Sequence, residues 1–221
     1  MVTAITRPHA DTGLLLLADI SGYTAFLGKV ATEHPDMVQP GGQVPPAYVV
    51  MSSLLDMVVD RIAPAFHLCE IEGDAVFAYA ADDPGLVQGE QDLMALVRSA
   101  YAGFRERIDE AMVVHKHECR ACFLLPSLEL KFVVHHGNFV IQPIAGQTKL
   151  LGPTVNVAHR LLKNSVTQQM GSRAYLLVTD AAAGRLHFRP DTGLAHEENY
   201  PDVGTVAGRV IGLAEPPGDV P

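Results

Sequence analysis

Apolar residues occur along the chain in short runs separated by Gly, Pro and charged residues, a pattern that predicts a mixture of strands and helices. Residues 13–20 (GLLLLADI) form an apolar run with an acid near its end, which is typical of a strand buried on both faces, although periodicity alone leaves a short helix open. Gly73-Asp74 and His136-Gly137 are hairpin signals between pairs of apolar runs. The further predicted strands cover residues 66–72, 75–80, 128–135, 138–143, 175–179 and 205–213.

Helical spacing of apolar residues is clearest over residues 93–115, where one apolar stripe runs along the segment. Gly152-Pro153 predicts the start of a helix that extends to about Asn164, because proline in the first turn removes no hydrogen bond. The other predicted helices cover residues 23–32 and 48–62, with a short Ala-rich helix between the two late strands. This order of elements predicts an α+β fold in which helices cover a mostly antiparallel sheet.

The length of 221 residues fits one domain with a core large enough to fold without disulfides or metal. We expect a flexible lead-in over residues 1–12, a single domain over residues 13–213 and a disordered tail over residues 214–221. The Pro- and Gly-containing stretch 35–46 predicts a loop or lid.

Charge and hydropathy exclude several classes of partner. Sixteen Lys and Arg against 25 Asp and Glu leave a net charge of −9, which argues against a nucleic-acid-binding module. The apolar runs are shorter than the ~20 residues that a membrane-spanning helix needs, and the N-terminus lacks the pattern of a secretion signal. Three cysteines do not make a disulfide framework, so the cytoplasm is the expected compartment.

Three short segments contain residues suited to chemistry. Asp19 ends the first buried run, where an acid is costly unless its charge is compensated; capping of the next helix is the alternative. Glu70, Glu72 and Asp74 occupy alternate positions beside a Gly turn, so a strand would place their three negative charges near one another unless a cation lies between them. Alternatively, Asp74 is simply a turn residue.

The third segment opens the helix at Gly152. Asn156 and Arg160 are four residues apart, so a helix places an amide and a guanidinium on one face. The same spacing is typical of a solvated helix face.

In combination and order, these segments resemble the catalytic domain of class III nucleotidyl cyclases over residues 13–213. Asp19 to Thr24 is similar to the strand-end D-I-x-G-[FY]-T pattern of that family, and Gly73 to Ala78 to its hairpin pattern G-D-[AS]-x-x-A. Gly152 to Arg160 resembles its G-x-T-V-N-x-A-x-R helix start, and residues 130–137 resemble the preceding strand and turn. Residues 72–80 and 159–164 are closer still to a divergent, functionally uncharacterised bacterial branch of the superfamily.

The resemblance implies a ferredoxin-like cyclase-homology sandwich and a role for each motif residue. Asp19 and Asp74, with the Ile20 carbonyl as a further ligand, would hold two Mg²⁺ or Mn²⁺ ions. Asn156 would orient the ribose of a nucleoside triphosphate, and Arg160 would stabilise charge at its α-phosphate. In the family the two halves of each site come from opposite subunits, so a homodimer with sites at its interface is expected.

The chain also departs from the family pattern. Glu70 stands at a base-reading position and is nominally guanylyl-like, but its companion is Lys149, and the two could pair with each other and leave the base unread. Pro153 replaces the usual Asp or Asn, and Thr205 stands where the family has a triphosphate-binding Lys, with Arg209 the nearest cation. Loss of such a cation lowers the rate by orders of magnitude.

A His/Cys-rich insertion at residues 115–122 lies outside the resemblance. His115, His117, Cys119 and Cys122 form a candidate zinc site, although the ligands are more crowded than in most structural zinc sites. A helix end with surface histidines and a buried thiol pair is the alternative.

Two classes of function follow. The first is a metal-dependent cyclase that converts a nucleoside triphosphate to a 3′,5′-cyclic nucleotide and pyrophosphate. The second is a dimeric nucleotide or ligand sensor that keeps the fold without turnover, which the departures at Lys149, Pro153 and Thr205 favour. A dimerisation domain in which Asp19 and Asp74 are only ion-paired is a third interpretation.

Overall fold

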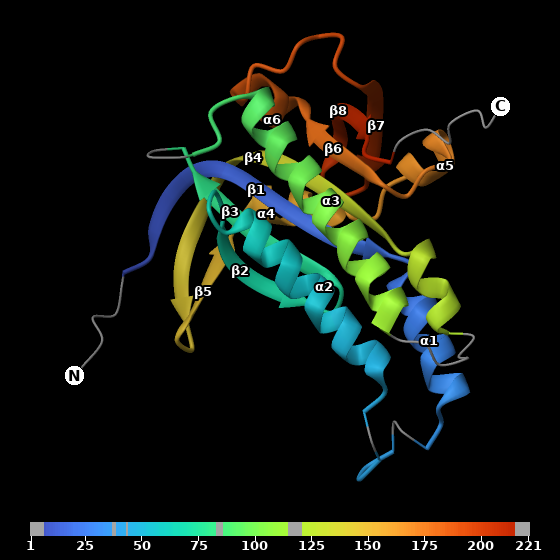
Figure 1. Ribbon diagram of the computed structural model, residues 1–221. Helices are drawn as coiled ribbons and strands as arrows, with labels where there is room; N and C mark the ends of the chain where they lie inside the picture. The colour runs from blue at the N-terminus through green and yellow to red at the C-terminus, as the bar shows by residue number, and fades with distance from the viewer. Residues whose placement is uncertain (1–6, 37–38, 43, 83–85, 115–120, 215–221) are drawn as a thin grey trace, which may run out of the picture.

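The computed structural model describes residues 7–36, 39–42, 44–82, 86–114 and 121–214. Within these ranges the chain forms one eight-stranded sheet with the order β2-β3-β1-β4-β6-β8-β7, and β5 pairs with β4 outside this path (Figure 1). The β4–β6 pair is parallel and the other pairs are antiparallel. The predicted α+β class with a mostly antiparallel sheet is therefore confirmed.

The strands are β1 (His9–Ser21), β2 (His67–Glu72), β3 (Ala75–Ala81), β4 (Glu129–Ile144), β5 (Gln147–Leu151), β6 (Tyr175–Thr179), β7 (Leu194–Tyr200) and β8 (Gly204–Gly212). The helices are α1 (Tyr23–Glu33), α2 (Pro46–Ile62), α3 (Glu90–Val114), the 3-10 helix η1 (Cys122–Ser127), α4 (Pro153–Arg160), α5 (Val166–Met170) and α6 (Asp180–Arg185).

The central strand β1 lies between β3 and β4 and is buried on both faces, as its continuous apolar run predicts. Leu14 and Leu16 face the larger apolar cluster, which the long helices α2 and α3 cover. Leu15 and Leu17 face the opposite cluster, to which α4 contributes Val155. The strand begins at His9, so it extends four residues further toward the N-terminus than the apolar run suggests.

The predicted hairpin with its turn at His136-Gly137 is wrong, because β4 continues through both residues. His136 and Gly137 pair with Leu14 and Gly13 of β1, in a ladder that extends from Ser21 to His9. A glycine within a strand often marks the close approach of a neighbour, and a Cβ on Gly137 would lie 2.9 Å from the side chain of Thr154. The turn instead falls at Ala145-Gly146, where φ is 52° and 79°.

The helix that opens at Gly152 ends at Arg160 and does not reach Asn164. Asn164 donates from Nδ2 to the Leu161 carbonyl at 2.7 Å and accepts from the Val166 N–H at 3.0 Å, so its side chain competes with helical backbone bonds. The polar strands β5 and β7 were not predicted, since neither shows a clear apolar alternation.

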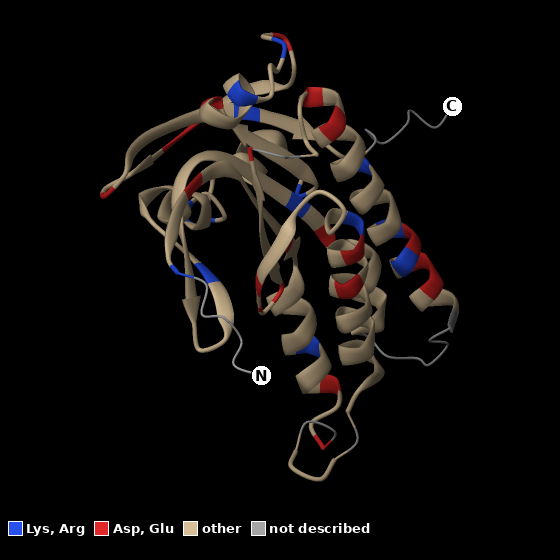
Figure 2. Ribbon diagram, turned by 90° about the vertical axis from the view of Figure 1, so that its left-hand side faces the viewer, with Lys and Arg blue, Asp and Glu red and all other residues tan. Residues whose placement is uncertain are grey.

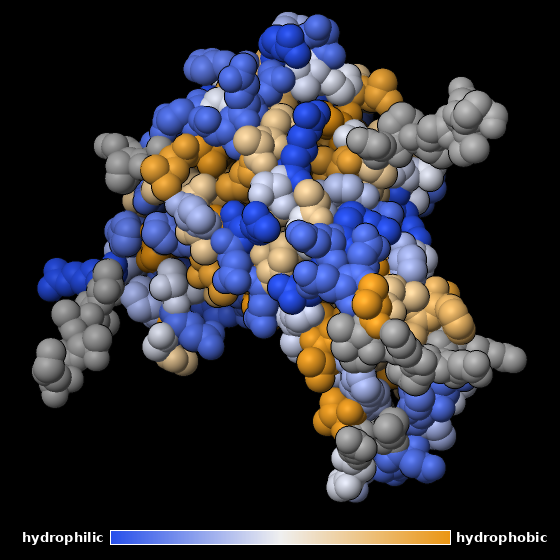
Figure 3. Space-filling model, in the orientation of Figure 1, coloured by the Kyte–Doolittle hydropathy of each residue, from blue (hydrophilic) through white to orange (hydrophobic). Residues whose placement is uncertain are grey.

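The surface is mixed in character. Figure 2 shows acidic residues spread over the helices with basic residues among them. Large apolar side chains are exposed on several elements, among them Val49 of α2 and Phe123 of η1. Figure 3 shows hydrophobic and hydrophilic surface interspersed on one face. Among the described residues, no helix is both long and apolar enough to cross a membrane.

Candidate functional site

Asp19 lies at the end of β1, directly opposite Ala75 of β3 and Lys131 of β4. Its Oδ2 is 2.9 Å from Lys131 Nζ, and both side chains are 17% exposed. Glu72 of β2 lies opposite Ala75, so Lys131, Asp19 and Glu72 lie in one row across the sheet with Ala75 between the two acids. The charge of Asp19 is therefore compensated by an ammonium rather than by a helix cap.

Asp74 follows at the β2–β3 turn, and its backbone carbonyl accepts from the Ile20 N–H at 3.2 Å. Burial and the charge of Asp19 raise the pKa of the Asp74 carboxyl, while Lys131 acts in the opposite direction. Together with the Ile20–Asp74 hydrogen bond and the pairing of Asp19 with Ala75, this places the two acidic residues next to each other. The structure thus brings Asp19, Ile20 and Asp74 to one place, although their role as metal ligands stays a prediction.

The N-terminus of α1 begins just beyond Asp19. Gly22 precedes this helix with φ 96° and provides no side-chain cap for the first backbone N–H groups. Arg173, before β6, reaches the same place: a Cβ on Gly22 would lie 3.3 Å from its Nη1. Its Nη2 donates to the Ser127 carbonyl at 2.6 Å. A guanidinium beside uncapped helix N–H groups suits an anion such as a phosphate.

Asn156 and Arg160 line a groove of about 950 Å³ with Glu72, Lys163 and Asp202. Arg160 is 52% exposed, and its Nη2 lies 3.3 Å from the Asp202 carboxylate in the turn between β7 and β8. Exposed pairs of this kind contribute roughly 0–1 kcal/mol, so Arg160 is readily released toward a ligand. Asp19 and Asp74 are not among the residues that line this groove.

Glu70 and Lys149 form an ion pair, with Oε1 and Nζ 2.6 Å apart and exposures of 34% and 27%. The two residues come from β2 and β5, which do not pair in the sheet, and they meet because the sheet curls. Of the two arrangements predicted for these positions, the structure shows the mutual pair. Burial raises the pKa of the adjacent Cys69 to about 12, so this thiol stays protonated at neutral pH.

Arg209, the cation nearest in sequence to Thr205, is bound by backbone carbonyls. Its Nη1 donates to the carbonyls of Pro190 and Thr192, in the segment before β7. Thr205 accepts a hydrogen bond from Asn199 at 3.3 Å. The Arg209 guanidinium is thus engaged with backbone carbonyls, whereas the Arg173 guanidinium lies beside the start of α1.

The chemistry of the donors fits a magnesium or manganese site that a substrate completes. Mg²⁺ is usually held by one or two carboxylates together with waters and substrate phosphates, and Asp19 and Asp74 offer two carboxylates. Over the described ranges, no group of three or more His, Cys, Asp or Glu side chains is arranged to hold a metal. A site made by the protein alone is thus not seen in that part of the chain.

The candidate zinc ligands His115, His117 and Cys119 lie outside the described residues. Cys122 is described; it is buried at the start of η1. The zinc site stays a prediction.

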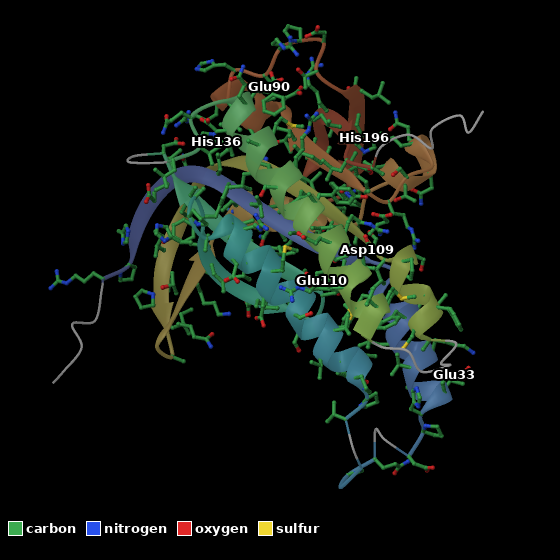
Figure 4. All side chains as sticks on the ribbon, in the orientation of Figure 1. Glu33, Glu90, Asp109, Glu110, His136 and His196 are labelled. Atoms are coloured by element: carbon green, nitrogen blue, oxygen red, sulfur yellow. The ribbon has the colours of Figure 1, made fainter. Side chains whose placement is uncertain are left out.

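Two further histidines lie on separate strands in the upper part of Figure 4, away from α1. His136 Nε2 is 2.9 Å from Asp82 Oδ2, and His196 Nε2 is 2.8 Å from Glu198 Oε1. Both rings pair with a carboxylate, and His136 lies within β4 rather than in the predicted turn.

Lys131 and Arg173 were not recognised from the sequence as residues of the candidate site. Lys131 lies in a segment predicted as a strand, and its position opposite Asp19 depends on the β1–β4 register. Arg173 follows Gly171-Ser172 in an unremarkable polar stretch. Neither residue gives a local signal that could have marked it.

Comparison with solved structures defines the class of fold. The guanylyl cyclase Cya2 is similar with a TM-score of 0.63 and 13% sequence identity, over 97% of this chain and 98% of that one. A class III adenylyl cyclase-like ATP-binding protein from Pseudomonas aeruginosa gives a TM-score of 0.56 and 17% identity, over 82% of this chain and 36% of that one. The chain thus has the fold of class III nucleotidyl cyclase domains, as the resemblance implies.

The sequence family is also defined. The chain belongs to the family described as "Protein of unknown function (DUF2652)", whose model matches residues 51–170. An uncharacterized protein of Mycobacterium tuberculosis is 33% identical over 135 residues, which span 60% of this chain and 58% of that protein. The match therefore covers less than two thirds of the mycobacterial relative.

Proposed function

We propose that the chain is a metal-dependent nucleotidyl cyclase that converts a nucleoside triphosphate to a 3′,5′-cyclic nucleotide and pyrophosphate. One observation carries this proposal: within a cyclase-like fold, Asp19 and Asp74 come from neighbouring strand ends joined by the Ile20–Asp74 hydrogen bond, beside the uncapped start of α1 and the guanidinium of Arg173. This arrangement offers oxygen donors for a cation and positive groups for phosphates.

In the proposed reaction the ribose 3′-oxygen forms a bond to the α-phosphorus while the bond from that phosphorus to the β-phosphate oxygen breaks. The proton of the 3′-hydroxyl passes to solvent, and pyrophosphate leaves. Bound Mg²⁺ or Mn²⁺ would stabilise the attacking and leaving oxygens. Asn156 would hold the ribose, Arg160 would stabilise charge at the α-phosphate, and Arg173 would bind the departing phosphates.

The active unit of this proposal is a homodimer. Asn156 and Arg160 line a groove that does not include Asp19 or Asp74. Each site is therefore proposed to join the carboxylates of one subunit with the α4 side chains of the other. No nucleic-acid or membrane partner is part of the proposal, and we place the protein in the cytoplasm on its low cysteine content.

A second candidate is a nucleotide-binding sensor without turnover. It is favoured by the internal pairing of charged groups: Asp19 with Lys131, Glu70 with Lys149 and Arg160 with Asp202. Each pair must be loosened before its members act on a substrate. The solved ATP-binding protein with the same fold shows that cyclase-like folds also occur in proteins named for binding.

A product assay separates the two candidates. The purified chain is incubated with ATP or GTP and Mn²⁺, and cyclic nucleotide is measured by mass spectrometry beside an Asp74→Ala control. Product that disappears in the control supports the cyclase. Triphosphate binding without product at high protein concentration supports the sensor, and absence of both binding and product rejects the two candidates together.

Mixing two inactive variants tests the shared site. If carboxylates and α4 side chains come from different subunits, Asp19→Ala and Arg160→Ala mixed in equal amounts form heterodimers with one intact site. Random exchange then restores roughly a quarter of the wild-type activity. Activity that stays at the level of the separate variants rejects the shared site.

A further inference from the structure

Lys131 is a charged residue held within the sheet. It lies on β4 directly opposite Asp19, and its side chain is 17% exposed. The ammonium is 2.9 Å from Asp19 Oδ2 and donates to the Leu162 carbonyl at 3.2 Å. The charge of Lys131 also acts to lower the pKa of the Asp74 carboxyl. Two of its three N–H donors therefore have identified acceptors.

These two contacts join parts of the chain that are far apart in the sequence. Asp19 ends β1, whereas Leu162 lies in the turn that follows α4 and also lines the groove beside Asn156 and Arg160. In this way one ammonium connects a carboxylate proposed to bind a cation with the end of the helix proposed to contact the substrate.

The turn after α4 is itself held in a defined position. The Tyr200 hydroxyl donates to the Lys163 carbonyl at 3.2 Å, and the Tyr175 hydroxyl donates to Asn164 Oδ1 at 2.9 Å. Ser165 Oγ donates to Glu198 at 2.7 Å. Side chains from β6, β7 and the turn itself therefore hold this segment in one position. Because the Leu162 carbonyl is held there, its hydrogen bond orients the Lys131 ammonium toward Asp19.

We propose that Lys131 is the resident counter-ion of Asp19 and weakens the binding of a divalent cation at Asp19 and Asp74 until substrate phosphates add negative charge. This inference rests on the proposed function. A divalent cation at Asp19 meets the repulsion of an adjacent positive charge, which is reduced only partly by solvent because the pair is largely buried. Lys131 is thus a positioning residue that makes cation binding depend on the triphosphate.

Mn²⁺ titration without nucleotide tests the inference. Free Mn²⁺ is followed by electron paramagnetic resonance for the wild type, Lys131→Gln, Lys131→Arg and Lys131→Met. Lys29→Gln is the matched control, since Lys29 also forms an ion pair, with Glu33 on α1. We expect the two neutral variants at position 131 to bind Mn²⁺ roughly tenfold more tightly than the wild type. Lys131→Arg and the control should stay within roughly twofold, because neither removes the charge at position 131.

Hydrogen exchange gives a readout that needs no metal. The amides of residues 161–166 should exchange faster in Lys131→Met, which donates no hydrogen bond to Leu162, than in the wild type. Lys131→Gln keeps an N–H donor and provides a second variant if the methionine variant does not fold.

The outcomes distinguish this inference from the proposed function. If Mn²⁺ binds to the wild type and the neutral variants with equal affinity, the role of Lys131 is rejected and the proposed function stands. If no protein binds Mn²⁺ even with a triphosphate present, the proposed function is rejected and the inference with it.

Discussion

The Glu70–Lys149 pair provides a direct test of whether the nucleotide base is read. With the carboxylate occupied by the lysine, the wild type should discriminate little between ATP and GTP. Lys149→Met removes the ammonium and releases Glu70, whose carboxylate can then accept the N–H groups on the pairing edge of guanine. Adenine offers an acceptor at the corresponding ring nitrogen, so the release should favour GTP.

The energy of the pair follows from its geometry. Two charges in contact near a protein surface attract by about 4 kcal/mol at an effective dielectric constant near 20. The side chains are 27% and 34% exposed, so solvent screens part of this attraction. The entropy lost on fixing two long side chains and the loss of part of their hydration offset most of the rest. We therefore expect a net coupling of about 1 kcal/mol, and roughly tenfold preference for GTP after release of Glu70.

Two measurements check these magnitudes. Urea unfolding of the wild type, Glu70→Gln, Lys149→Met and the double variant gives the coupling free energy as the departure from additivity. Calorimetric titration with ATP and GTP in the presence of Mn²⁺ gives the preference, with Lys29→Met as a control for the loss of an ion-paired lysine.

Either of two results would refute this reasoning. A coupling below about 0.3 kcal/mol, together with an unchanged GTP-to-ATP ratio in Lys149→Met, means that the pair neither forms in solution nor masks Glu70. A wild type that already prefers one base by roughly a hundredfold means that other residues read the base.

Three further predictions concern stability and phosphate binding. Gly13→Ala should lower the free energy of unfolding by about 1–3 kcal/mol, because its Cβ would meet the backbone of β3. Gly28→Ala, on an open helix face, should raise the free energy of unfolding by up to about 1 kcal/mol. Urea unfolding measures both changes, and equal effects would contradict the packing. Burial and His136 lower the pKa of His135 to about 4 in the native protein. Between pH 6.5 and 4 the His135 ring is therefore protonated in unfolded chains but stays neutral in the native protein. The free energy of unfolding should fall by about 1–3 kcal/mol as the pH decreases through this window. The free energy of unfolding of His135→Gln should fall less over the same pH range, and an equal decrease would contradict this prediction. Arg173→Met should weaken triphosphate binding, measured by calorimetry, by roughly tenfold or more. Arg209→Met is the control, because its guanidinium binds backbone carbonyls before β7, and it should change the triphosphate affinity less than about twofold. The reverse order would remove Arg173 from the site.

Most strands and helices could be predicted because their signals are local. The apolar run of β1, the apolar stripe of α3 and the start of α4 at Pro153 each depend on residues within a few positions of one another. The strand β6 was predicted with its observed bounds, Tyr175–Thr179.

Other features depend on a partner that the sequence does not specify. Gly137 suits a turn as well as a strand, and the backbone of β1 beside it makes it part of β4. The polar strand β7 forms because β8 supplies its hydrogen bonds, since its own side chains provide no alternating apolar face.

The same division holds for the site. The sequence alone offered Asp19, Asp74, Asn156 and Arg160 as candidates, through the resemblance of their short motifs to those of class III cyclases, and their roles stay predictions. Only the tertiary structure decided which charges meet: Lys131 reaches Asp19 through the β1–β4 register, and Lys149 reaches Glu70 because the sheet curls. Electrostatic pairing depends on distance in space, and residues separated by tens or a hundred positions acquire that distance only when the chain folds.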